Sequence, residues 1–206
     1  FYIIPTICVI GFLLSSINLM VFLNPKLKGD TYKYFSAKTL AELLFLAIGT
    51  FYPYSLCTSC TIYQTYPVVF FSAYIQTFVL YCAYFFIALC EIVVIYDRLI
   101  IFYNNQKLHF NYLIVLSTMI VLSIGTFIPI LFGNSIQEIP NNPGKFIVVR
   151  TNFARANSYI LYQGFIQVAI NFTVFFLIIF LNILLIAKFK NYLAKKSTIT
   201  ISKSTI

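Results

Sequence analysis

Long apolar stretches alternate with short polar segments along the whole chain. A helix that rises 1.5 Å per residue needs about 20 residues to cross the hydrocarbon core of a bilayer. Five stretches are long enough, so the pattern predicts five transmembrane helices. They are Tyr2–Leu23, Tyr34–Tyr52, approximately Pro67–Phe102, Phe110–Phe132 and approximately Tyr159–Ala187.

Turn residues, rather than charges, separate the second stretch from the third. No charged residue occurs between Leu43 and Cys90. Pro53 and Pro67 instead enclose a segment with several Ser and Thr residues, and such a segment breaks a helix. Two helices with a short connection fit this length, whereas one continuous helix does not.

Two other segments are polar. The connection from Gly133 to Ser158 contains the β-prone run Phe146–Val149 after a turn sequence, which predicts a small hairpin. Residues 195–206 are rich in Lys, Ser and Thr. We expect this last segment to be a mobile tail or the start of a third cytoplasmic loop, following a membrane domain over residues 1–194.

The basic residues predict the orientation of the helices. With the N-terminus outside, eleven basic residues fall in cytoplasmic regions and three in outer regions, as the positive-inside rule requires. We therefore expect an outer N-terminus and a cytoplasmic C-terminus. The cytoplasmic set is Lys26, Lys28, Lys33, Lys38, Arg98, Lys107, Lys188, Lys190, Lys195, Lys196 and Lys203, and the outer set is Lys145, Arg150 and Arg155.

Composition supports lipid as the main solvent. Apolar residues make up 61% of the chain and charged residues 9%, against roughly 25% charged residues in soluble domains. The net charge of +9 lies in short segments between apolar runs, which suits an anionic membrane surface rather than nucleic acid. We find no nucleophile–base pair, phosphate-binding loop or metal-ligand cluster, so we expect neither an enzyme nor a bound cofactor.

Four polar residues lie at a similar depth in their predicted helices. Asn18, Glu42, Glu91 and Asn182 are each six to eight residues from the cytoplasmic end, or roughly 9–12 Å. Ionisable residues at such a depth are costly and often functional. One interpretation is a shared polar layer with Glu42 at its centre. The other is that each residue separately hydrogen-bonds a neighbouring helix.

The ordered motifs resemble those of rhodopsin-like G-protein-coupled receptors, particularly invertebrate peptide and chemosensory members. Asp97 and Arg98 end the third predicted helix, as in the family's Asp-Arg-Tyr signature, with Leu99 in place of Tyr. The other matching segments are Asn18, Asn24–Lys28, Ala41-Glu42 and Asn182–Leu185.

This resemblance implies a seven-helix bundle in the plasma membrane, of which the chain is an N-terminal fragment with helices one to five. It implies that Arg98 is a switch, paired with Asp97 at rest and released to meet a heterotrimeric G protein. Asn18 and Glu42 would then belong to the polar network that connects the ligand pocket to the cytoplasmic end.

The chain departs from the family in several respects. The connection Gly133–Ser158 has no Cys for the usual disulfide to helix three, and the chain has no Trp. Relatives often hold sodium at the helix-two carboxylate, and the longer Glu42 side chain weighs against that site. Cys57 and Cys60 share the first outer connection and could form a local disulfide or remain free thiols. Cys8, Cys82 and Cys90 are expected to be buried thiols.

The third and fifth predicted helices supply candidate ligand contacts. In amine receptors an aspartate lies 17 residues before the Asp-Arg pair; here Leu80 stands there, so the resemblance weighs against an amine. A peptide or an uncharged small molecule suits the aromatic and amide side chains better, although ordinary packing explains them equally well. The candidate pocket residues are Gln76, Thr77, Tyr81, Tyr162, Gln163 and Gln167.

Two alternatives remain open at the level of sequence. The first is a fragment of a secondary transporter or channel with Glu42 and Glu91 as ion or proton ligands. The second is a truncated membrane protein that does not signal but associates with a full-length partner.

Overall fold

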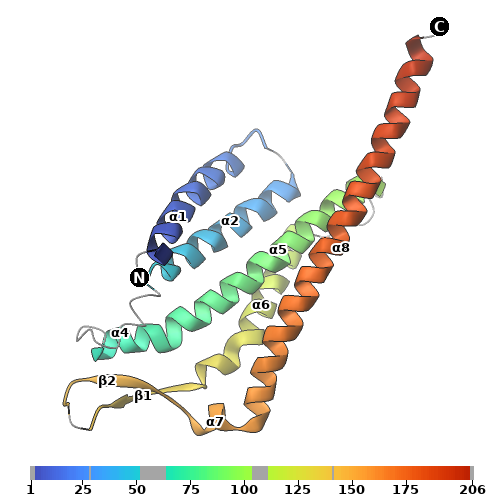
Figure 1. Ribbon diagram of the computed structural model, residues 1–206. Helices are drawn as coiled ribbons and strands as arrows, with labels where there is room; N and C mark the ends of the chain where they lie inside the picture. The colour runs from blue at the N-terminus through green and yellow to red at the C-terminus, as the bar shows by residue number, and fades with distance from the viewer. Residues whose placement is uncertain (1–2, 28, 52–63, 104–110, 141, 205–206) are drawn as a thin grey trace.

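The computed structural model describes residues 3–27, 29–51, 64–103, 111–140 and 142–204, and these are mostly helical (Figure 1). Its helices are α1 (Ile3–Phe22), α2 (Asp30–Gly49), α4 (Tyr66–Phe70), η2 (Phe71–Gln76), α5 (Thr77–Tyr103), α6 (Tyr112–Leu131), α7 (Asn152–Arg155) and α8 (Asn157–Ser204). Two strands, β1 (Asn134–Glu138) and β2 (Phe146–Arg150), connect α6 to α7.

Four of the described helical segments are long and apolar enough to cross a membrane. They are Ile3–Phe22, Tyr66–Ile100, Tyr112–Leu131 and Asn157–Lys190. The chain thus has the helices of a multi-pass membrane protein. The remaining predicted span, Tyr34–Tyr52, corresponds to α2, which carries Asp30, Lys33, Lys38 and Glu42 and is therefore less apolar than the others.

Helix α2 nevertheless lies inside the bundle, packed against both α1 and α5. It begins at Asp30, four residues earlier than predicted, and ends at Gly49 rather than Tyr52. An acidic residue in the first turn favours a helix N-terminus because it complements the helix dipole. The four extra residues place Thr31 and Lys33 on the helix, where both make contacts described below.

The segment from residue 195, which we expect to be a mobile tail or the start of a third cytoplasmic loop, continues α8 as a helix to Ser204. Neither Gly nor Pro occurs after Gly164, so the sequence contains no strong signal that would end the helix. Figure 1 shows α8 running beyond the ends of the other helices.

The third predicted span is confirmed as one helical run that contains an unpredicted π-helical turn. The run begins at Tyr66, with Pro67 in its first turn, where proline is favoured. Residues Phe71–Gln76 form η2, and Thr77 Oγ1 donates to the Ser72 carbonyl at 3.1 Å. Single π-helical turns often occur at functional sites.

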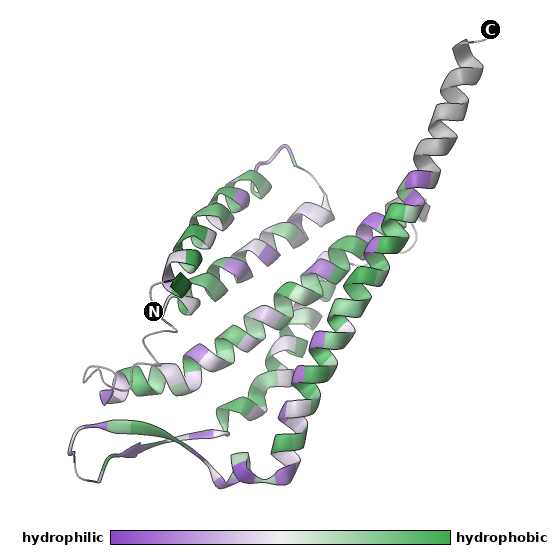
Figure 2. Cartoon of the chain, viewed as in Figure 1, coloured by the Kyte–Doolittle hydropathy of each residue, from purple (hydrophilic) through white to green (hydrophobic). Residues whose placement is uncertain are grey.

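The core lies along α5, which packs against α2, α6 and α8. Cys90 is completely buried and Val94 is 2% exposed. A cluster of Phe85, Phe127 and Ile130 joins α5 to α6, and partly buried side chains of α8 pack against it. Figure 2 shows apolar residues along the length of these helices, and many of their large apolar side chains are exposed. Such exposed side chains suit contact with lipid.

The predicted hairpin is confirmed, with β1 and β2 antiparallel and Ile136 opposite Val148. It is attached to η2 without a disulfide. Asn134 Nδ2 donates to the Ala73 carbonyl at 3.1 Å, and Tyr74 Oη donates to the Asn134 carbonyl at 2.9 Å. This reciprocal pair fixes the base of the hairpin to the helical run. A ring contact between Phe146 and Tyr66, with centroids 5.3 Å apart, fixes the far strand.

Candidate functional site

The end of α5 opposite the hairpin positions Asp97 and Arg98 in different surroundings. Asp97 is only 8% exposed and accepts a hydrogen bond from the Thr31 hydroxyl at the start of α2. Arg98 is exposed, and its guanidinium lies 5.3 Å from the centre of the Phe35 ring, a cation–π contact. Successive residues on a helix point about 100° apart, which explains why the two side chains diverge.

The predicted Asp97–Arg98 pairing does not occur among the ion pairs of the described residues. Those pairs join Lys33 to Asp30 and Lys38 to both Glu42 and Glu91. The carboxylate of Asp97 is therefore held by α2, while the guanidinium remains on the surface of the bundle.

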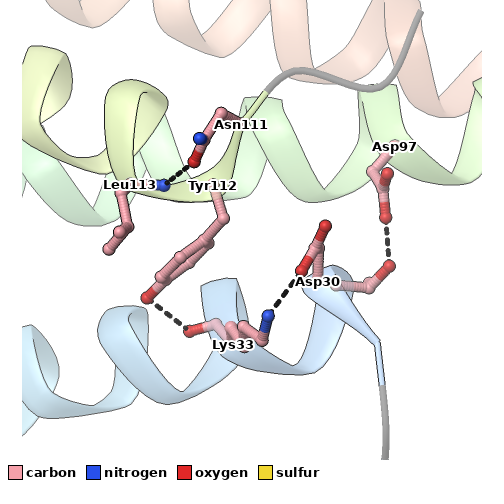
Figure 3. A network of polar contacts seen from close by, with 7 residues as sticks. Asp30, Lys33, Asp97, Asn111, Tyr112 and Leu113 are labelled. Atoms are coloured by element: carbon pink, nitrogen blue, oxygen red, sulfur yellow. Dashed lines mark hydrogen bonds and ion pairs between the residues drawn. The ribbon is translucent and has the colours of Figure 1, made fainter. Parts of the chain in front are cut away.

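Polar and aromatic contacts connect the beginnings of α2 and α6 beside Asp97 (Figure 3). Lys33 Nζ lies 2.8 Å from Asp30 Oδ1 and donates a hydrogen bond to it. Tyr112 Oη donates to the Lys33 carbonyl at 3.4 Å, and the Tyr34 and Tyr112 rings are 4.9 Å apart. Asn111 caps α6 by accepting from the Leu113 amide at 3.0 Å. We refer to these contacts, with Thr31–Asp97, as the α2–α5–α6 junction.

A cavity of about 390 Å³ lies beside this junction. Its polar lining comes from Asp30, Tyr34, Tyr96 and Asp97, and its apolar lining from α5, α6 and α8. Residues of four helices, α2, α5, α6 and α8, therefore line this cavity.

The predicted polar layer forms in part. Glu42 and Glu91 meet through Lys38, whose ammonium hydrogen-bonds Glu91 and lies 3.6 Å from Glu42. The side chains of Asn18 and Asn182 take part in none of the described contacts of this cluster. Asn182 donates to the Ile178 carbonyl of its own helix at 2.9 Å, and Asn18 is exposed on α1.

Sequence reasoning missed the role of Lys38. The orientation prediction counts the charge of Lys38 in the cytoplasmic set, because Lys38 lies near the predicted start of the second span. The spacing of four residues between Lys38 and Glu42 was the available signal, since residues i and i+4 are neighbours on a helix surface. The contact with Glu91 joins residues 53 positions apart and had no sequence signal.

Three of the six predicted ligand contacts line one groove of about 490 Å³ between α2, α5 and α8. They are Gln76, Thr77 and Tyr81, and the remaining lining residues are Phe45, Leu80, Tyr84 and Asn171.

The other predicted contacts lie on α8. Gln167 reaches the groove indirectly, because its Nε2 donates to the hydroxyl of Tyr81 at 3.0 Å. Tyr162 instead donates to the Thr126 carbonyl of α6, and Gln163 does not line the groove. Sequence reasoning missed Asn171, which accepts from the Tyr84 hydroxyl at 3.1 Å.

The described cysteines Cys8, Cys82 and Cys90 are free thiols. Cys57 and Cys60 lie outside the described residues. Within the described part of the chain, no group of three or more His, Cys, Asp or Glu side chains could hold a metal ion.

Comparison with known proteins adds no family assignment. No protein-family model matches the chain, and no curated protein matches it significantly.

Proposed function

We propose that the chain forms the first five helices of a seven-helix, rhodopsin-like receptor at the plasma membrane. The receptor senses an extracellular ligand and activates a heterotrimeric G protein. In this proposal α2 is a fifth span, the N-terminus and the hairpin end face outward, and the α2–α5–α6 junction faces the cytoplasm.

The exposure of the Arg98 guanidinium at the end of α5 carries the proposal. Burial of Asp97 against Thr31 secures the end of α5 to α2. Arg98 keeps its guanidinium exposed over Phe35, held there by a contact that a partner can displace. A guanidinium presents five donors in a fixed plane, which suits recognition of carboxylates or backbone carbonyls on a partner protein.

The groove between α2, α5 and α8 supports the proposed ligand class. None of its seven lining residues is charged, and they offer phenol, amide, hydroxyl and apolar groups. Its volume of about 490 Å³ falls in the range of small-molecule sites. A peptide side chain or an uncharged small molecule fits this lining, and Leu80 provides no counter-charge for an amine.

The contact of Lys38 with Glu42 and Glu91 weighs against the transporter or channel alternative. An ammonium already occupies the position between the two carboxylates that a transported cation would take. Purified protein in liposomes should therefore show no ion flux that depends on Glu42. Flux that is lost in Glu42→Gln would favour the alternative.

Nucleotide exchange on a G protein tests the proposal. In membranes that contain the complete receptor, Arg98→Ala should abolish basal exchange, while Arg98→Lys should retain part of it because the charge remains. Arg155→Ala, which removes an exposed arginine from α7, is the matched control and should exchange like the wild type. Wild-type exchange by Arg98→Ala would overturn the assignment of Arg98.

A further inference from the structure

Lys38 has two carboxylate partners that differ in what they connect. Glu91 lies on α5, so its contact with Lys38 joins two helices. Glu42 lies one turn further along α2, at 3.6 Å, so its contact stays within one helix. The side chains of Lys38, Glu42 and Glu91 are 22%, 29% and 33% exposed, respectively.

The charges of this cluster do not balance. One ammonium and two carboxylates sum to −1, so Lys38 cannot fully neutralise both partners. The completely buried Cys90 precedes Glu91, and the 3% exposed Thr39 follows Lys38. In such partly dry surroundings an ammonium without a partner is costly. Lys38 must therefore keep at least one carboxylate in any arrangement of the helices.

We propose that Lys38 is a two-position conformational switch. In the first position it hydrogen-bonds Glu91 and holds α2 against α5, with Glu42 3.6 Å away, which is the arrangement in the structure. In the second it transfers to Glu42, which releases α5 from α2. Because Lys38 keeps a carboxylate in both positions, the exchange leaves no unpaired ammonium. The inference rests on the proposed function, in which the released arrangement is the signalling state.

The two carboxylates consequently have opposite effects, although both contact the same lysine. Glu91→Gln removes the partner on α5, so Lys38 moves to Glu42 and the released state is favoured. Glu42→Gln removes the alternative partner, so Lys38 stays on Glu91 and the held state is favoured. If the released state is about 10% populated in the wild type, Glu91→Gln raises basal nucleotide exchange by up to about tenfold.

Hydrogen exchange of the α2 amides provides a readout that does not require a G protein. In lipid nanodiscs, Glu91→Gln should accelerate exchange in α2, because released helices open locally more often, and Glu42→Gln should slow it. Lys38→Met should accelerate it and should cancel the effect of Glu42→Gln in the double variant. Glu138→Gln on the hairpin makes the same chemical change away from the cluster and should match the wild type.

The two readouts separate the switch from the receptor proposal. Opposite shifts in α2 hydrogen exchange support the switch, and failure of every form to promote nucleotide exchange would then overturn only the receptor proposal. Shifts of the same sign for Glu42→Gln and Glu91→Gln would overturn the switch. Shifts no larger than that of Glu138→Gln would also overturn it.

Discussion

The hydroxyl of Thr31, in the first turn of α2, donates a hydrogen bond to the buried carboxylate of Asp97 near the end of α5. The two residues are 66 positions apart in the sequence. This bond joins the second and third helices at the end of the bundle where Arg98 is exposed. It therefore connects the stability of the junction to the position of the proposed G-protein contact.

Thr31→Val should destabilise the protein, because it replaces a donor to a buried carboxylate with a methyl group of similar shape. A hydrogen bond to a charged group contributes about 1.5–3 kcal/mol to stability. Thermal unfolding in detergent should show a lower midpoint for Thr31→Val, while Thr31→Ser should stay near the wild type. Equal midpoints for the Val and Ser variants would show that the hydroxyl is unimportant.

The hairpin should depend on Asn134 and Tyr74 for its position. Tyr74→Phe removes one bond of the reciprocal pair, and Asn134→Ala removes the bond from the Asn134 amide to Ala73. Each variant should increase amide hydrogen exchange in β1 and β2, measured by mass spectrometry. Tyr84→Phe removes a phenol hydroxyl further along α5 from the hairpin, and it should leave amide hydrogen exchange in β1 and β2 unchanged. Unchanged exchange in both hairpin variants would contradict this account of the attachment.

Gly133 and Gly164 should respond to alanine in opposite directions. A Cβ at Gly133 would lie 2.7 Å from the Tyr159 hydroxyl oxygen and 3.2 Å from the Ile130 carbonyl oxygen, so Gly133→Ala forces a local shift. At Gly164, within α8, a Cβ meets no atom within 4 Å. Because alanine favours a helix over glycine by about 1 kcal/mol, Gly164→Ala should raise the unfolding midpoint. A higher midpoint for Gly133→Ala would contradict the described packing.

The sequence predicted the elements whose signals are local. Long apolar runs identified α1, the run from Tyr66, α6 and α8, and turn residues before Phe146 identified the hairpin. These local signals are weaker at the end of the chain, where α8 continues to Ser204. The Lys-, Ser- and Thr-rich end of α8 resembles a mobile tail in composition, but it lacks the Gly or Pro that would stop a helix.

The site was less predictable because its contacts join distant segments. Glu42 and Glu91 lie at a similar depth in their predicted helices, which predicts a shared polar layer. Depth alone does not predict that the ammonium of Lys38 lies between the two carboxylates. Adjacent charges suggested that Asp97 pairs with Arg98. The helical rotation between neighbouring residues instead turns Asp97 toward Thr31 and leaves Arg98 over Phe35.

The number and direction of membrane crossings test the account most directly, because α2 is the least apolar of the proposed spans. Epitope tags would be inserted at Asn24, between α1 and α2, and at Asn142, in the hairpin turn. If α2 crosses the bilayer, antibodies should detect the Asn142 tag on intact cells and the Asn24 tag only after permeabilisation. Detection of both tags on the same side of the membrane would contradict the five-helix arrangement and the receptor proposal that depends on it.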